Sequence, residues 1–253
     1  MRTHISRTGA LARTIALWVS AHLAAGQVAN GQAVNIQARE NASIQVVQEQ
    51  ATTSNAGLLR IAAVKYSGGG DWYQASTPLP NFLRYVRTNT LMQVDTRPDV
   101  VELSSDKVFG FPFLFLSGHG NIVLSDGEAQ RLRRYLQNGG FLYVDDDYGL
   151  DEYIRREMKK IFPEKSFVEL PFDHEIYHAH YPFPNGLPKI HEHDNAPPRG
   201  YGLFHEGRLI VFYTYETNIS DGWESPEVHN DSPETRETAF RMGTNILTYA
   251  MMH

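Results

Sequence analysis

The stretch Phe111-Pro-Phe-Leu-Phe-Leu-Ser-Gly-His-Gly120 decides the fold. Its first six residues are almost continuously apolar, as expected of a strand that is buried on both faces of a sheet. Its last four are polar and rich in glycine, which is typical of the loop that follows such a strand. A sheet with both faces buried needs helices on each side, so the stretch predicts an α/β domain with a mostly parallel sheet.

The flanking sequence repeats this alternation of strand and helix. In chain order the predicted elements are strands at 58–66, 99–103, 111–116 and 141–144, helices opening at Pro78 and spanning 125–137 and 150–162, a hairpin over 201–214 and a helix over 231–251. Strands and helices that alternate with short connections indicate a mostly parallel sheet with helices on both faces. We therefore expect one α/β domain over residues 58–253 that ends in a hairpin and a helix.

The first 33 residues have the pattern of a secretory leader. Basic side chains come first, an apolar run over 14–25 follows, and small residues come next. This run is shorter than the ~20 apolar residues that span a bilayer. An amphipathic helix packed on the domain is the alternative. We predict a signal peptide over 1–33, a flexible polar spacer over 34–57, and a periplasmic or secreted protein with no membrane span once the leader is cleaved.

Charge and cysteine content exclude several classes of function. The chain has 23 basic and 29 acidic side chains, and the predicted leader takes three of the basic ones and no acidic one. An acidic chain argues against nucleic acid as a partner. The absence of cysteine excludes a thiolate nucleophile and a thiolate metal site. The partners that we expect are a small molecule, a glycan or an envelope protein.

Polar segments follow three of the predicted strands and predict a site at one edge of the sheet. In open α/β sheets, ligands bind beyond the carboxyl ends of the strands. One alternative is that such loops are ordinarily polar; another is that one aspartate only caps the helix near residue 150. The candidate catalytic residues are Asp145, Asp146 and His119. The candidate ligand-binding residues are Gly69, Gly70, Asp71, Trp72 and Tyr73. Trp72, Tyr73 and Trp223 could stack on a sugar, and could equally be aromatics of the core or the rim.

Seven of the eleven histidines lie between His174 and His229. His174–His178 spells H-E-x-x-H, which binds zinc only on a helix, and the prolines on both sides disfavour a helix there. If residues 174–180 are extended, three histidines point to one side. The candidate metal ligands are His119, Asp146, His174, His178 and His180, for Zn²⁺, Mn²⁺, Fe²⁺ or Ca²⁺. The alternative is a solvated, histidine-rich loop.

Several of these motifs resemble a bacterial family described as domain of unknown function 4159. The matching stretches are Tyr66–Tyr73, Leu116–Gly120, Gly139–Leu142 with Asp145 and Asp146, Asp173–Tyr177, Gly207–Leu209, and Asn245, Ile246, Tyr249 and Ala250, within about 58–252. The resemblance implies a flavodoxin-like fold of the class I glutamine-amidotransferase type. In that fold a nucleophile would follow the strand over 141–144, where this chain has two aspartates. The resemblance implies no reaction.

Two functional hypotheses remain. The first is an exported envelope protein with a metal-binding or metal-dependent hydrolase-like domain. Its site would be lined by His119, Asp145, Asp146 and His174. The second is a non-catalytic module that binds an envelope protein or a glycan through the same edge of the sheet.

Overall fold

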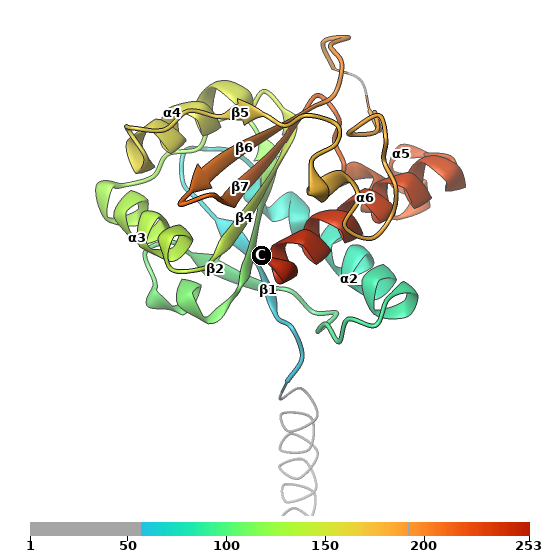
Figure 1. The fold of residues 1–253 in the computed structure, drawn as a ribbon, viewed down its shortest axis with the longest axis horizontal. Coiled ribbons are helices and arrows are strands. Elements are labelled where there is room, and N and C mark those ends of the chain that lie inside the picture. Colours follow the sequence, from blue (N-terminus) through green and yellow to red (C-terminus); the bar gives the residue numbers. More distant parts are fainter. Residues whose placement is uncertain (1–56, 192) are drawn as a thin grey trace, which may run out of the picture. The chain divides into compact units, whose positions relative to one another are not determined.

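The computed structural model describes residues 57–191 and 193–253. The predicted signal peptide and nearly all of the predicted spacer lie outside the described residues. Residues Gly57–His253 form one compact unit, which is built around a seven-stranded sheet in the order β2-β1-β3-β4-β7-β6-β5 (Figure 1). Among the described residues, none of the helices combines the length and the hydrophobicity that a membrane span requires.

The elements alternate along the chain as the sequence predicts. The strands are β1 Ile61–Lys65, β2 Asp99–Glu102, β3 Phe113–His119, β4 Phe141–Tyr148, β5 Val168–Glu169, β6 Arg199–His205 and β7 Arg208–Tyr215. The α-helices are α2 Pro78–Asn89, α3 Asp126–Gln137, α4 Asp151–Ile161, α5 Pro226–His229 and α6 Pro233–Met252. Short 3₁₀ helices are η1 Trp72–Ser76, η2 Asp106–Gly110, η3 Glu175–Tyr177 and η4 Asp221–Trp223.

Five strands run parallel, and their order gives the doubly wound arrangement. Strands β2, β1, β3, β4 and β7 pair in parallel, while β6 is antiparallel to both β7 and β5. The parallel strands follow the order 2-1-3-4-5 of flavodoxin-like sheets when β7 is counted as the fifth. The predicted α/β class, the C-terminal hairpin and the final helix are therefore confirmed. The two-residue strand β5 is too short to leave a pattern in the sequence.

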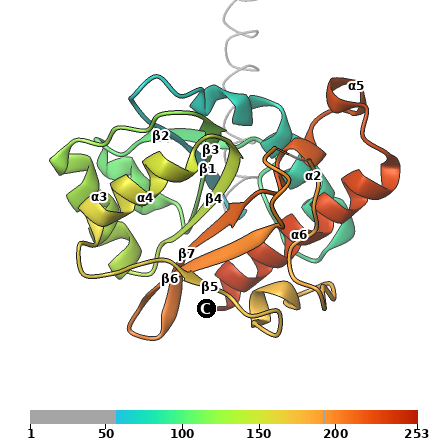
Figure 2. The same cartoon turned by 90° about the horizontal axis from the view of Figure 1, so that it is seen from above.

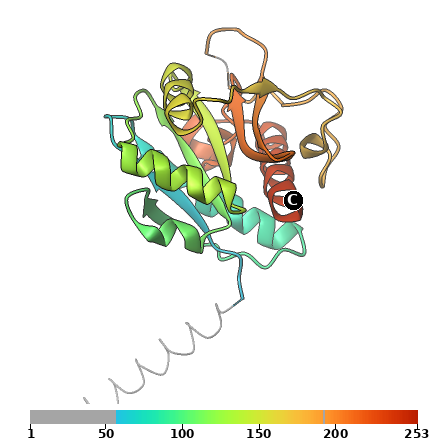
Figure 3. The same ribbon diagram turned by 60° about the vertical axis from the view of Figure 1, so that its left-hand side comes forward.

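Two layers of helices cover the sheet. Figure 2 shows α3 and α4 on one side of the strands and α2 and α6 on the other, and Figure 3 shows α6 beside α2. Side chains alternate between the layers along each strand. Phe113 and Phe115 pack in the core under α2 and α6, whereas Leu114 and Leu116 pack under α3 and α4.

The helix that follows β3 begins where the sequence predicts. The Ser125 hydroxyl accepts the Glu128 backbone N–H at 3.3 Å, and the Glu128 carboxylate accepts the Ser125 N–H at 2.8 Å. This reciprocal pair is the predicted capping box and satisfies two backbone donors at the start of α3.

Candidate active-site cleft

A cleft lies at the carboxyl edge of the sheet. The ends of β1, β3, β4 and β7 surround it, together with the segment that contains His191 and His193 and the helix α5. The volume of the cleft is about 520 Å³, within the range of small-molecule sites. The lining residues are Tyr73, Gln74, Ser76, Thr77, His119, Asp147, His191, His193, Asn218, Asp221, Glu224, Val228 and His229. The cleft lies where the sequence predicts a site.

The glycine loop after β1 packs on the loop after β3. The Gly70 N–H donates to the Asn121 carbonyl at 3.0 Å, and the Val123 N–H donates to the Ser67 carbonyl at 2.7 Å. A Cβ at Gly118, whose φ is +140°, would collide with Tyr66 and Asp71. The Gly70 N–H is therefore already used within the chain and is not free for a ligand. The loop instead brings Asp71 to His119.

His119 and Asp71 form a fixed pair. The Asp71 carboxylate accepts the His119 backbone N–H at 2.5 Å and lies 3.0 Å from the imidazole Nδ1. Burial acts to raise the pKa of Asp71, but the hydrogen bonds from His119 lower it below its ordinary value. Because Nδ1 faces the carboxylate and the side chain is 46 % exposed, Nε2 is the nitrogen left for a ligand in the cleft.

Of the three consecutive aspartates of β4, Asp146 points to the opposite side from its two neighbours because side chains alternate along a strand. Asp146 faces α4, where it accepts the Leu150 N–H at 3.0 Å and the Tyr213 hydroxyl at 3.1 Å. Burial raises the pKa of Asp146 to about 6. This carboxylate therefore supports the start of α4 and is not among the residues that line the cleft. The prediction that Asp146 shares a site with His119 is therefore wrong.

Asp145 lies on the opposite face from Asp146 and is fully buried. It accepts hydrogen bonds from the Thr214 hydroxyl at 2.5 Å and from the N–H and hydroxyl of Ser220, both at 2.6 Å. Burial raises its pKa. These bonds anchor the loop after β7, and the residues that line the cleft do not include Asp145. Its position is that of a support for the cleft.

Asp147 is the aspartate of this run that reaches the cleft. Its carboxylate lies 3.3 Å from the His119 Nδ1 and accepts the Asn218 side-chain amide at 2.9 Å. The same amide donates to Asp221 at 3.0 Å. Burial and the negative charge of Asp221 raise the pKa of Asp147. A chain of polar contacts thus runs from His119 to Asp221.

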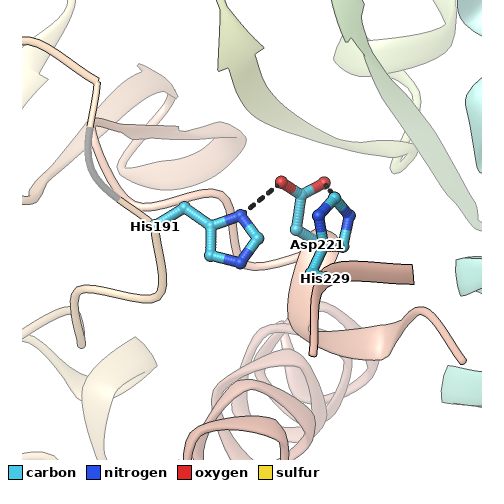
Figure 4. A group of neighbouring side chains, drawn as sticks. All are labelled: His191, Asp221 and His229. Atoms are coloured by element: carbon cyan, nitrogen blue, oxygen red, sulfur yellow. Dashed lines mark hydrogen bonds and ion pairs between the residues drawn. The ribbon is translucent and has the colours of Figure 1, made fainter. Parts of the chain in front are cut away.

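Asp221 is the centre of a second group in the cleft, with His191 and His229. The His191 Nδ1 lies 2.7 Å from one Asp221 oxygen, and the His229 Nε2 lies 3.8 Å from the other. Figure 4 shows the carboxylate between the two imidazoles. One ligand atom from each residue lies within 4.8 Å of the others, and in the described part of the chain no other group of three or more such residues meets this condition.

A further carboxylate orients His191. Asp231 lies 3.0 Å from Nε2, on the side of the ring opposite Asp221. The hydrogen bond to Asp221, followed by that to Asp231, raises the pKa of His191 to about 9. Metal-binding histidines commonly give their second nitrogen to a carboxylate in this way. His193 also lines the cleft, and its buried Nε2 has no hydrogen-bond partner among the described residues.

The loop after β7 has an unusual backbone. Glu216 and Asn218 have φ values of +57° and +51°, a left-handed conformation that costs free energy in residues other than glycine. Lys189 lies 2.8 Å from the Glu216 carboxylate, and Asn218 holds Asp147 and Asp221. These contacts stabilise the turn that presents Asp221 next to His191.

The histidines of the H-E-x-x-H motif lie elsewhere. Residues Glu175–Tyr177 form the 3₁₀ helix η3, so the extended conformation on which the grouping of the three histidines depended is not formed. The ring of His174 contacts Tyr249, and the His178 Nε2 lies 2.9 Å from the Phe172 carbonyl. The His180 ring contacts Tyr181. The structure does not group these three side chains with His119 or Asp146.

The predicted aromatic residues divide between surface and core. Tyr73 is 62 % exposed at the rim of the cleft, and Trp72 beside it is half-buried. Trp223 is buried, stacks on Phe82 and donates its indole N–H to the Ala239 carbonyl at 3.0 Å. Of the two alternatives for Trp223, the structure therefore shows the core aromatic.

Sequence patterns alone do not identify Asp147, His191, Asp221, His229 or Asp231 as residues of this site. Strand alternation was a usable signal for Asp147, because it separates Asp146 from its two neighbours. The other four belong to irregular segments or helix ends, where no periodicity indicates direction.

The comparisons agree with the motifs. Residues 60–251 match the model of the family described as Domain of unknown function (DUF4159), which confirms the resemblance. A comparison with curated proteins finds no match.

Proposed function

The chain belongs to the DUF4159 family over residues 60–251, and from that premise we propose that it is an exported, metal-dependent hydrolase-like protein of the cell envelope. The observation that carries the proposal is the convergence of His191, Asp221 and His229 in the cleft that also contains His119. The metal would be held by these three side chains, and substrate would enter between them and His119.

The donor set favours a first-row transition metal. Two imidazoles and one carboxylate suit Zn²⁺ or Fe²⁺, whereas Ca²⁺ takes oxygen ligands. Ligand atoms around a tetrahedral zinc lie roughly 3.4 Å apart, and the atoms here are 2.7–4.8 Å apart. Small rotations of the two rings would close the site. His193, with its unpartnered nitrogen, is a candidate for a further ligand.

The residues opposite the metal group can handle protons. His119 is oriented by Asp71 through Nδ1, which leaves Nε2 to accept a proton from an attacking water. Asp147 has a raised pKa and could return a proton to the leaving group. The contact chain through Asn218 links both groups to Asp221. Such an arrangement of metal, base and acid supports hydrolysis of a carbonyl or phosphoryl bond.

Metal analysis on the full chain tests the proposal. After chelation, we expect one equivalent of Zn²⁺ to bind to the unaltered protein and binding to be lost in His191→Ala and His229→Ala. His205→Ala is the matched control, because His205 ends β6 at the opposite edge of the sheet. A chain that binds no Zn²⁺, Mn²⁺ or Fe²⁺, and gains no thermal stability from them, contradicts the proposal.

Turnover separates an enzyme from a binding module. A panel of carboxylic esters, phosphoesters, peptides and glycosides would be tested with and without metal. We expect metal-dependent turnover that His119→Gln lowers at least about a hundredfold, the lower end of the usual acid–base contribution. Metal binding without any turnover would favour the non-catalytic module.

A further inference from the structure

A second hollow adjoins the cleft. It has a volume of about 530 Å³ and lies between the start of α2 and the edge strand β2. Its lining residues are Ala63, Trp72, Tyr73, Ser76, Pro80, Arg84, Thr96, Arg97, Pro98, Asp99 and Val100. We call it the β2 groove. Tyr73 and Ser76 also line the cleft, so one extended ligand can occupy both.

The floor of the β2 groove is apolar yet open to solvent. Tyr73 is 62 % exposed and Val100 is 58 % exposed, and the half-buried Trp72 lies beside Tyr73 with ring centroids 5.9 Å apart. Neighbouring exposed apolar side chains often mark a binding surface. Aromatic faces are also the surfaces on which the apolar faces of sugar rings stack. Hydroxyls of Ser76 and Thr96 add hydrogen-bonding groups.

Two arginines give the groove a positive rim in a chain whose net charge is −6. Arg84 is exposed and donates to the Asn81 side chain, and in residues 57–191 and 193–253 no carboxylate forms an ion pair with it. Arg97 is 78 % exposed and lies 3.6 Å from Asp95. Guanidinium groups bind carboxylates through paired hydrogen bonds. The rim therefore complements an anionic ligand.

We propose that the β2 groove binds a carboxylate-bearing sugar unit of an acidic oligosaccharide, whose adjoining unit reaches the cleft. The identification of this oligosaccharide as a substrate rests on the proposed function, but its binding does not. A uronic-acid unit uses every part of the groove: its ring stacks on the exposed Tyr73 with Trp72 at right angles beside it, its hydroxyls meet Ser76 and Thr96, and its carboxylate meets the arginines. A neutral glycan leaves both guanidinium groups unused, and an acidic peptide leaves the aromatic faces unmatched.

Calorimetric titration of the full chain with tetragalacturonate tests the proposal, with maltotetraose as the neutral probe and tetraglutamate as the acidic peptide. We expect tetragalacturonate to bind at least about tenfold more tightly than either, because charge-assisted hydrogen bonds add to stacking. The double substitution Arg84→Gln and Arg97→Gln should weaken its binding about tenfold or more. Tyr73→Ala should have a similar effect through lost stacking.

Two controls make the outcome decisive. Arg87→Gln, on an exposed turn of α2 outside the groove, should leave binding unchanged. His229→Ala and removal of metal should weaken it less than the arginine and Tyr73 substitutions do, because they affect only the unit that reaches the cleft, so a failed metal site does not hide a working groove. Absence of tetragalacturonate binding, equal binding of maltotetraose or tetraglutamate, or insensitivity to the arginine and Tyr73 substitutions would overturn the proposal.

Discussion

Histidines gather in two regions of the C-terminal half, and the two differ in what surrounds them. His174 and His178 have the spacing of a zinc motif but pack against Tyr249 and a backbone carbonyl. His191 and His229 have no motif spacing, yet both face Asp221. The first region has the pattern of a metal site in the sequence, and the second has the geometry of one in space.

The difference shows that bringing histidines and a carboxylate together requires neighbouring groups that hold them in place. Asp221 is held by Asn218 and follows Ser220, which hydrogen-bonds to the buried Asp145 of β4. His191 has Asp231 on its second nitrogen. His174 contacts the rings of Phe204 and Tyr249 and begins a short 3₁₀ turn, and within the described residues no carboxylate forms an ion pair with it. The sheet thus builds the second group by joining segments distant in the sequence.

The largest expected effect comes from removing ligands in each region. At a free Zn²⁺ concentration of about 100 times the Kd, binding stabilises the fold by about 2.7 kcal/mol. This corresponds to a rise in Tm of roughly 5–10 °C for a domain of this size. The double substitution His191→Ala and His229→Ala should abolish this rise, while His174→Ala with His178→Ala should keep it. Differential scanning calorimetry measures the Tm of both variants with and without Zn²⁺. Loss of the rise only in the variant without His174 and His178 would place the metal in the first region.

The next effect tests the support beneath the cleft. Asp145→Asn removes an acceptor from a buried site in which Thr214 and Ser220 supply three donors. We expect a loss of about 2 kcal/mol in the free energy of unfolding and weaker Zn²⁺ binding, because the loop that carries Asp221 loses its anchor.

Asp146→Asn is the matched control for this support, since Asp146 faces α4 on the other side of the sheet. It should destabilise the chain without changing Zn²⁺ affinity. Denaturant unfolding and zinc titration of both variants separate the two roles. Equal loss of affinity in the two variants would contradict the assignment of Asp145 as the support.

Much of the fold could be predicted because burial leaves a periodic trace. The apolar run of β3 and the capping box at Ser125 each specify an element directly, and the order of elements then limits the topology. The convergence of Asp71 and His119 at the carboxyl edge follows from that topology. Strand β5 escaped prediction because two exposed residues pair only through contacts with β6.

The ligand group could not be predicted in the same way. His191 lies in an irregular segment, and His229 ends the four-residue helix α5, so neither has neighbours whose period fixes a direction. Their meeting depends on the loop after β7, whose left-handed residues are a glutamate and an asparagine. Neither position is a glycine, which would have signalled such a turn. The H-E-x-x-H spacing predicted the wrong region because spacing acts only through the secondary structure that carries it.

A smaller effect on Zn²⁺ affinity is expected from removing the charge of a carboxylate beside the histidines of each region. Asp231→Asn keeps the size of the side chain but weakens the acceptor on His191 Nε2. Outer partners of this kind typically contribute 10–100-fold to metal affinity, so we expect a loss of about tenfold. Glu175→Gln is the control in the first region, where Glu175 pairs with His253, and it should leave Zn²⁺ affinity unchanged. An unaltered Zn²⁺ affinity in Asp231→Asn would show that the Asp231 carboxylate does not support metal binding by His191.

The smallest effect is a difference in proton affinity that requires no metal. Burial lowers the pKa of His174, whereas hydrogen bonds to Asp221 and Asp231 raise the pKa of His191 to about 9. In chelated protein, NMR titration should therefore show His191 still protonated at pH 7.5 while His174 is neutral. Because the folded pKa of His191 exceeds its ordinary value of ~6.5, its contribution to stability is fully present below pH ~6.5 and is lost as the pH rises through about 9. Asp221→Asn should bring the pKa of His191 back toward its ordinary value and flatten that part of the stability profile. If His174 and His191 had the same pKa, the proposed effect of Asp221 and Asp231 on His191 would be contradicted.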